Sequence, residues 1–284
     1  MDPVLVRIGP FAIRWYGLLI VAGALLAGYI AALEARRKGD DAEQVWDALA
    51  VVLITGLIGA RLYHVLSSPA GSIGWDYYRH HLIDIIAFWR GGFAGLGIYG
   101  AVAGGALGLW AFTYWNKLPF LRWADNAAPG LILAQAIGRW GNYINQELYG
   151  YPTTLPWGIT IDAAHRIPPY ENLTLYPLDT LFHPVFLYES LWNLLCFGLL
   201  MILARRYGGR LLEGDVFTAY FILYPFGRFF VEALRPDAWK VTSIPVAQII
   251  ALLCIAGAGT TLWYRHRAAA TASEPSQGEG EPQA

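Results

Sequence analysis

The sequence predicts an all-α polytopic membrane protein, with seven transmembrane helices and a small extracytoplasmic head. Three observations lead to this fold class. Hydrophobic residues make up 56% of the 284 positions and charged residues only 14%, about half the charged share of soluble domains. The 20 lysines and arginines are balanced by 21 aspartates and glutamates, so the basic excess of a nucleic-acid-binding protein is missing. The 12 tryptophans and 17 tyrosines are typical of chains with aromatic belts at the membrane surfaces.

Seven hydrophobic stretches approach the roughly 20 residues that a membrane-spanning helix needs. Three of them contain no Asp, Glu, Lys or Arg: 17–33, 91–116 and 241–264. The other four are shorter or interrupted, and each carries an ionisable residue near one end: 45–66, 126–144, 184–204 and 216–234. We expect no cleaved signal peptide, because the start of the chain lacks a basic region directly before its first hydrophobic run.

Short basic loops predict the orientation. These loops are 34–38, 116–122, 205–210 and 265–267. The positive-inside rule places them in the cytoplasm, so the N-terminus is expected outside and the C-terminus inside. We therefore expect residues 1–267 to form one seven-span domain, with 146–182 as its extracytoplasmic head. Residues 268–284 are rich in Ala, Ser, Glu, Gln, Gly and Pro, which predicts a disordered cytoplasmic tail.

The window 138–150 concentrates polar residues at the outer end of a predicted span. Arg139, Asn142 and Asn145 follow one another at intervals of three residues, so they share one broad face of a helix end. A guanidinium with two carboxamides suits a phosphate or another oxyanion. The alternative is a helix C-terminus at which Arg complements the dipole and Asn and Gly form the cap. An arginine within a spanning segment favours a functional role.

A second polar stripe lies in the window 224–237. Tyr224, Arg228, Glu232 and Arg235 recur at intervals of four, four and three residues, which places them on one helix face. Pro225 should kink this helix. The simpler alternative is an intrahelical ion pair between Arg228 and Glu232.

Two further segments complete the candidate residues. His183 precedes Pro184, which fits the first position of a helix, and Glu189 follows as an intramembrane acid expected to pair with an arginine. The glycine-rich segment 89–105 allows close helix packing. No His-Glu-x-x-His spacing or similar ligand pattern is present in the sequence, so we expect no metal site and no cofactor.

Together these windows resemble the prolipoprotein diacylglyceryl transferase family of the bacterial inner membrane. The similarity begins at Arg14-Trp15-Tyr16-Gly17 and ends at Arg235-Pro236-Asp237, with the windows in the family's order. It implies transfer of a diacylglyceryl group from phosphatidylglycerol to the lipobox cysteine thiol of a preprolipoprotein. A thioether forms and glycerol phosphate leaves. The expected partners are therefore phosphatidylglycerol, the preprolipoprotein signal peptide and the lipid bilayer, and the chain is expected to be a monomer.

The resemblance also implies roles for individual residues. Arg139 and Arg228 would bind the phosphate and stabilise the charge of the leaving group, with Asn142 and Asn145 in support. Glu147 and Glu232 would orient the two arginines. The remaining residues would contribute to the lipid and peptide site: Tyr16, Gly150, His183, Tyr188 and Tyr224.

The sequence departs from the family pattern at Tyr99. Many family members carry a histidine there, proposed as the base that activates the thiol. An unperturbed tyrosine has a pKa near ~10 and is a poor base unless a nearby arginine lowers that value. Three alternatives stay open: Tyr99 is activated, His183 or Glu147 acts as the base, or no dedicated base is needed.

A small-molecule transporter is the alternative from another functional class, since intramembrane Arg and Glu also mark substrate paths. Transporters tend to contain internal repeats, and the arginine-bearing windows of this chain are unlike one another. The charges also gather in the outer halves of the spans. These features favour the transferase.

Overall fold

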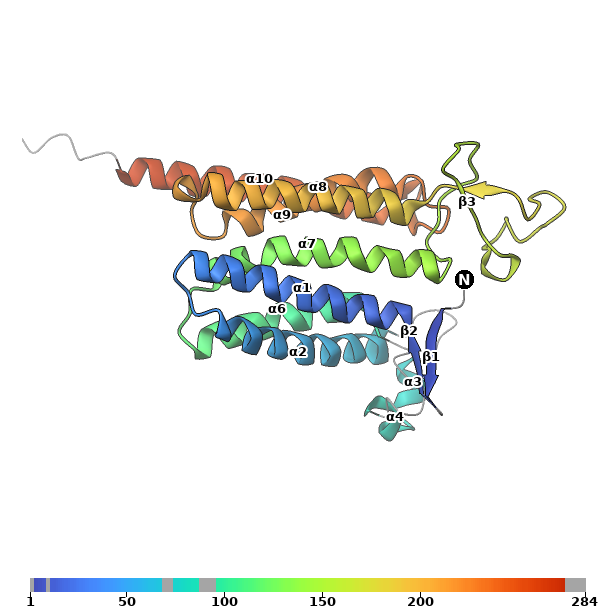
Figure 1. Cartoon of the computed structure of the whole chain (residues 1–284), viewed down its shortest axis with the longest axis horizontal. Coiled ribbons are helices and arrows are strands. Elements are labelled where there is room, and N and C mark those ends of the chain that lie inside the picture. Colours follow the sequence, from blue (N-terminus) through green and yellow to red (C-terminus); the bar gives the residue numbers. More distant parts are fainter. Residues whose placement is uncertain (1–2, 9–10, 68–73, 87–95, 274–284) are drawn as a thin grey trace, which may run out of the picture. The chain divides into compact units, whose positions relative to one another are not determined.

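Seven long helices dominate the computed structural model, which describes residues 3–8, 11–67, 74–86 and 96–273 (Figure 1). Their bounds are α1 Trp15–Arg37, α2 Glu43–Ser67, α6 Ile98–Trp115, α7 Phe120–Ile144, α8 Val185–Arg206, α9 Asp215–Glu232 and α10 Val246–Ser273. The shorter helices are α3 Trp75–Tyr78, α4 Leu82–Ile86 and the 3₁₀ turns η1 Ala163–His165 and η2 Gly208–Arg210. Each predicted span corresponds to one long helix.

Strands are few and short in the described part of the chain. They form three antiparallel pairs: β1 Val4–Ile8 with β2 Phe11–Arg14, β3 Ile159–Thr160 with β4 Leu181–Phe182, and β5 Lys240–Val241 with β6 Ile244–Pro245. None of these pairs was predicted. They connect or precede the long helices and leave the helical class unchanged.

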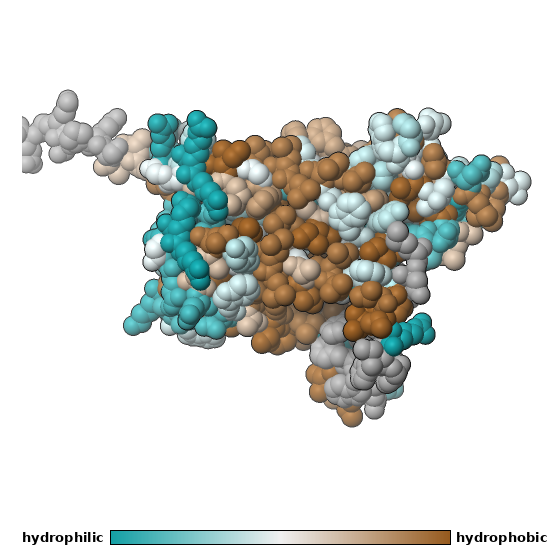
Figure 2. All heavy atoms as spheres, in the orientation of Figure 1, coloured by the Kyte–Doolittle hydropathy of each residue, from teal (hydrophilic) through white to brown (hydrophobic). Residues whose placement is uncertain are grey.

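Four of the long helices, α1, α2, α8 and α10, are long and apolar enough to cross a membrane by length and composition. Figure 2 shows largely hydrophobic side chains along the faces of the helices in view, with hydrophilic side chains near helix ends. The helices α6, α7 and α9 have 18, 25 and 18 residues and fall short of the same criterion. Their crossing of the membrane stays a prediction.

Three helix boundaries differ from the sequence-based expectation. Helix α7 begins at Phe120, before the predicted span 126–144, so Asp125 lies inside the helix and is buried. Helix α10 begins at Val246 because β5 and β6 occupy the preceding residues, and it continues to Ser273. Residues 268–273 of the predicted disordered tail are therefore helical. Residues 274–284, and the glycine-rich positions 89–95, lie outside the described residues.

The chain forms two compact units. The first unit is Ile30–Asn126, and the second unit combines Met1–Tyr29 with Ala127–Ala284. In the first unit, α2 and α6 pack backbone against backbone. A Cβ on Gly59 would lie 2.3 Å from the carbonyl oxygen of Gly100, and one on Gly104 would lie 2.3 Å from that of Thr55. Small residues permit such close approach between membrane helices, which confirms the packing interpretation for these described glycines.

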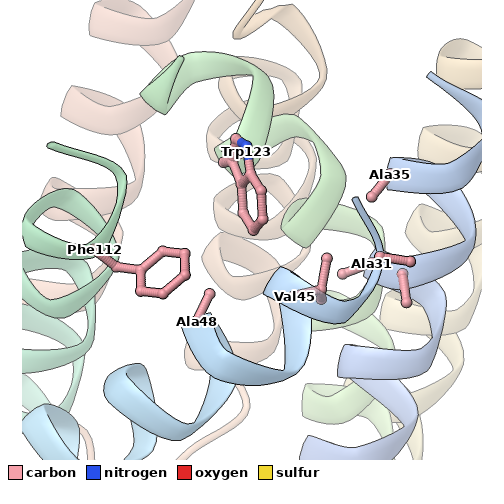
Figure 3. Close-up of a cluster of buried hydrophobic side chains, with 8 residues drawn as sticks. Ala31, Ala35, Val45, Ala48, Phe112 and Trp123 are labelled. Atoms are coloured by element: carbon pink, nitrogen blue, oxygen red, sulfur yellow. The ribbon is translucent and has the colours of Figure 1, made fainter. Parts of the chain in front are cut away.

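A buried cluster lies near the end of the α2–α6 pair in the same unit. Figure 3 shows Phe112 of α6 and Trp123 of α7 with Val45 and Ala48 of α2. Beside this cluster, Arg122 Nε pairs with Asp40 Oδ2 at 2.9 Å, and Asn126 Nδ2 donates to the same oxygen at 3.3 Å. These contacts fix the connection between α1 and α2 to the start of α7.

The second unit contains the segment 146–182, which has a small core of its own. Tyr149, Ile161, Tyr170 and Phe182 form this buried cluster. Arg166 is 4% exposed and donates hydrogen bonds to the carbonyl oxygens of four residues, which are Ile161, Tyr176, Pro177 and Leu178. Burial raises the pKa of Tyr149, whose hydroxyl accepts a hydrogen bond from the Ile167 N–H at 2.7 Å.

Candidate active site

Helix α7 carries Arg139 in its last two turns and ends at Ile144. The ring of Tyr16, in the first turn of α1, packs directly against α7 at Gly141. A Cβ on Gly141 would lie 2.2 Å from Tyr16 Cδ2, so only glycine permits this contact. Trp140 Nε1 donates to Ser190 Oγ at 3.2 Å, and Ser190 Oγ donates to the Ala136 carbonyl oxygen at 3.0 Å. These bonds hold α8 against the arginine-bearing end of α7.

Glu189 of α8 connects the two arginines that the sequence singled out. Its Oε2 pairs with Arg139 Nε, and its Oε1 pairs with Arg228 Nη1 of α9. Glu189 is 5% exposed, so the carboxylate lies between two guanidinium groups with little solvent. A buried charge is stabilised only when it is paired and hydrogen-bonded, and Glu189 meets that need for both arginines as they do for Glu189.

The polar stripe of α9 forms as its spacing predicted. Arg228 Nη2 pairs with Glu232 Oε2, which lies 3.6 Å from Arg235 Nη1. Arg235 in turn donates two hydrogen bonds to Asp237. Its Nε lies 3.0 Å from Oδ1, and its Nη2 lies 2.6 Å from Oδ2. The predicted intrahelical pair is therefore present, and it is one part of a longer ion-pair network.

The two arginines keep donors for a further ligand. Arg139 contacts Glu189 and Asn142, and Arg228 contacts Glu189 and Glu232, among the described residues. A guanidinium carries five N–H donors. Two partners that take two donors each leave at least one donor for a ligand. The side chains are 21% and 17% exposed, so the free donors can be reached. This arrangement can bind an oxyanion such as a phosphate diester.

The end of α7 gathers two carboxamides around one carboxylate. Asn142 Nδ2 and Asn145 Nδ2 donate to Glu147 Oε1 at 2.8 and 3.3 Å. Asn142 Oδ1 lies 3.5 Å from Arg139 Nη1. Among the described residues, Glu147, which we expected to orient an arginine, therefore connects to Arg139 through Asn142. Gln146 adopts a positive φ of 53°, which turns the chain and brings Glu147 back to this position.

A second polar group forms where the 146–182 segment meets α8. The hydroxyl of Tyr188 lies 3.1 Å from His183 Nδ1 and accepts a hydrogen bond from Trp157 Nε1 at 2.8 Å. The Gly150 N–H donates to the His183 carbonyl oxygen at 3.0 Å. A Cβ on Gly150 would lie 2.7 Å from His183 Cβ and 3.0 Å from the Leu234 carbonyl oxygen, which explains the need for glycine.

Tyr224 lies one turn before Arg228 on α9, and its ring stacks on that of Tyr220 with centroids 5.7 Å apart. It lines a pocket between α8 and α9 whose other lining residues are Glu189, Trp192, Asn193, Gly227, Arg228 and Val231. The pocket leads from the ion-pair network toward the middle of both helices.

Tyr99 belongs to the other compact unit, in the first turn of α6. Its side chain is 65% exposed, and its ring lies 5.7 Å from that of Tyr63. The remaining predicted site residues all lie in the unit that contains α7, α8 and α9.

Sequence comparison identifies the family. Residues 3–264 match the family model described as prolipoprotein diacylglyceryl transferase. The chain belongs to this family. Relatives in the prolipoprotein diacylglyceryl transferase family include the phosphatidylglycerol–prolipoprotein diacylglyceryl transferase of Chloroflexus aggregans, 40% identical over 273 residues that cover 91% of this chain and 87% of that protein. The equivalent proteins of Symbiobacterium thermophilum and Streptococcus sanguinis are 42% and 37% identical, covering 95% of this chain and 95% and 98% of their own lengths.

Family membership confirms three sequence-based predictions. The protein is a multi-pass, all-α membrane protein, it is a diacylglyceryl transferase of lipoprotein maturation, and the resemblance drawn from the motif windows is correct. The transporter alternative is not supported by these relatives.

One residue of the network was underestimated from the sequence. Glu189 was expected to pair with a single arginine, and the structure shows it between two. The available signal was its position as a lone acid within a predicted span that follows His183-Pro184. A carboxylate at such a position must be paired, although the sequence alone does not show with how many partners.

Proposed function

We propose that this chain transfers the diacylglyceryl group of phosphatidylglycerol to the lipobox cysteine of a preprolipoprotein, with Arg139 and Arg228 holding the lipid phosphate. The observation that carries this assignment is the pairing of both arginines with the one carboxylate of Glu189. It fixes two guanidinium groups side by side, each with donors to spare.

The reaction requires stabilisation of growing negative charge. The cysteine sulfur attacks the glyceryl carbon that is bonded to the phosphate oxygen. A carbon–sulfur bond forms, the carbon–oxygen bond breaks, and its electron pair goes to that oxygen of the departing glycerol phosphate. The phosphate group changes from a singly charged diester to a more highly charged monoester. Donors that are already in place, in a site with little water, stabilise such charge strongly.

The supporting residues act on the arginines or on the substrates. Glu232 orients Arg228 directly, whereas Glu147 acts on Arg139 through Asn142. Asn145, bound to the same carboxylate oxygen, completes this group. The remaining members line the lipid and peptide site in our proposal, namely Tyr16, Gly150, His183, Tyr188 and Tyr224.

The thiol must lose its proton to become a good nucleophile, and in our proposal the phenolate form of Tyr99 accepts that proton. Its side chain is exposed, and its hydroxyl has no hydrogen-bond partner among the described residues. His183 and Glu147 are the alternatives: His183 Nδ1 shares a hydrogen bond with Tyr188, and Glu147 Oε1 accepts hydrogen bonds from Asn142 and Asn145.

We further propose that the N-terminus lies outside the plasma membrane and the C-terminus in the cytoplasm. Basic residues end α1 and α8, where Arg36, Arg37, Arg205 and Arg206 occupy the last turns. Both helix ends are followed by predicted cytoplasmic loops, in agreement with the positive-inside rule. The phosphate-binding group then lies in the outer half of the membrane, with residues 146–182 above it, and we propose that the functional form is a monomer.

Complementation tests the proposed function. The full chain is expressed in a bacterial strain depleted of its own transferase, and lipid attachment to a reporter lipoprotein is measured. We expect attachment with the unmodified chain and none with Arg139→Ala or Arg228→Ala, both of which should still insert in the membrane. Lipid attachment by both arginine variants would reject the phosphate-binding role. Failure of the correctly inserted unmodified chain would reject the reaction as proposed.

A further inference from the structure

Asn193 of α8 is a buried polar residue that the roles above leave unused. It is 1% exposed, and its side-chain Nδ2 is buried with no hydrogen-bond partner among the described residues. An unpaired buried amide donor is destabilising. Such groups are uncommon in folded proteins and require an explanation.

The position of Asn193 suggests an explanation for its unpaired donor. It lines the pocket that also contains Glu189 and Arg228, and it lies four residues beyond Glu189 on the same helix. Four residues correspond to about 6 Å along a helix axis. Trp192 and Tyr224 contribute aromatic walls between Asn193 and the end of the pocket that contains Glu189 and Arg228. Trp192 is itself fixed, because its Nε1 donates to the Leu223 carbonyl oxygen at 2.9 Å.

The pocket therefore has the Arg228 guanidinium, paired with Glu189 and Glu232, at one end, apolar walls, and one unused donor at its inner end. A complementary ligand carries an anion and, a few bonds away, an acceptor oxygen without a hydrogen of its own. In a diacyl phospholipid, the phosphate and the acyl ester carbonyls have this relationship. We propose that Asn193 Nδ2 donates a hydrogen bond to an acyl ester carbonyl of the lipid substrate, so that this small pocket takes one carbonyl of the diacylglyceryl group being transferred. This inference rests on the proposed phosphate-binding role of Arg139 and Arg228.

The test compares two lipids and two forms of Asn193. The full-length enzyme is supplied with phosphatidylglycerol that carries either two ester-linked or two ether-linked chains, the latter without carbonyl oxygens. The ratio of kcat/KM for the diester and diether lipids is measured for the unmodified chain and for Asn193→Leu, which keeps the side-chain size and removes the donor. A neutral hydrogen bond of ordinary strength predicts that this substitution lowers the ratio about three- to tenfold. Any chemical effect of the ether linkage is present in both enzymes and cancels.

Gln135→Leu is the matched control. Gln135 Nε2 donates to the Tyr220 hydroxyl at 2.9 Å, while its buried Oε1 has no partner among the described residues. An unused acceptor cannot bind an ester carbonyl, so the lipid ratio should stay at the value of the unmodified enzyme. If the diester-to-diether ratio of kcat/KM falls as far in Gln135→Leu as in Asn193→Leu, the effect comes from general packing and the assignment is overturned.

Asn193→Ala provides a second route if the leucine variant does not insert. An unchanged lipid ratio in the Asn193 variants, with Arg139→Ala and Arg228→Ala inactive on both lipids, would overturn the role of Asn193 alone. Activity of both arginine variants on the two lipids would instead overturn the proposed phosphate site.

Discussion

Arg139 and Arg228 pair with the two different oxygens of one carboxylate, that of Glu189. Three helices, α7, α8 and α9, each contribute one member of this group. Two guanidinium groups in a site of low dielectric repel each other strongly. A shared carboxylate offsets this repulsion and fixes the spacing of the two cations. The geometry of the proposed phosphate site therefore depends on Glu189 as much as on either arginine.

Removal of this shared charge should disturb both arginines together. We expect Glu189→Gln to lower kcat about 10- to 100-fold, the range produced by small displacements of groups that position a substrate. Lipid transfer by the purified full-length enzyme, followed with a reporter peptide, measures the change. Glu171→Gln, on the exposed surface of the 146–182 segment, is the control and should leave kcat unchanged. An unaltered kcat in Glu189→Gln would mean that the arginines hold their positions without it.

Charge alone should not replace the two guanidinium groups. A lysine ammonium is a compact charge that cannot make paired hydrogen bonds to two oxygens. We expect Arg139→Lys and Arg228→Lys each to lower kcat/KM about 10²-fold or more, the cost of losing a donor that stabilises developing negative charge. Because both residues act on one phosphate, the double variant should lose less than the product of the two single effects. Arg206→Lys, exposed at the end of α8, should behave like the unmodified enzyme, and multiplicative losses would contradict a shared phosphate.

The sequence allowed prediction of those features that depend on short-range spacing. The stripe of Arg228, Glu232 and Arg235 follows from helical periodicity, and the structure contains both of its ion pairs. Seven hydrophobic stretches correspond to seven long helices, because the length of a hydrophobic run is also a local property of the sequence. The early start of α7 also had a local signal: Pro119 precedes its first residue, and prolines commonly stand at helix starts.

Long-range pairings had no such signal. Glu189 lies 50 residues from Arg139 and 39 from Arg228 in the chain, and nothing in the sequence shows that α8 packs beside both α7 and α9. The fit of Trp192 against Gly227 is similar, since a Cβ there would lie 2.2 Å from Trp192 Cδ1. Such contacts depend on tertiary packing, which periodicity does not specify.

The hydroxyl of Tyr99 is the group to remove in order to test the base. If it accepts the thiol proton, Tyr99→Phe should lower turnover about 10²-fold, the lower range for general base catalysis. The ring should still pack against Tyr63, whose centroid lies 5.7 Å away, so folding should be preserved. Tyr63→Phe is the matched control and should retain full turnover. Near-normal turnover of Tyr99→Phe, measured at several pH values, would remove Tyr99 as the base and turn attention to His183.

Replacing each of two glycines in the long helices by alanine should change the stability of the protein in opposite directions. A Cβ on Gly104 of α6 would lie 2.3 Å from the backbone oxygen of Thr55, whereas one on Gly198 of α8 would meet no atom of the described residues within 4 Å. Gly104→Ala should force α2 and α6 apart and destabilise the protein by about 1–3 kcal/mol, the usual cost of overpacking. Gly198→Ala should instead stabilise it by about 0.5–1 kcal/mol, because alanine favours the helix. Thermal unfolding in detergent measures both, and equal stability of the two variants would contradict the close backbone contact between α2 and α6.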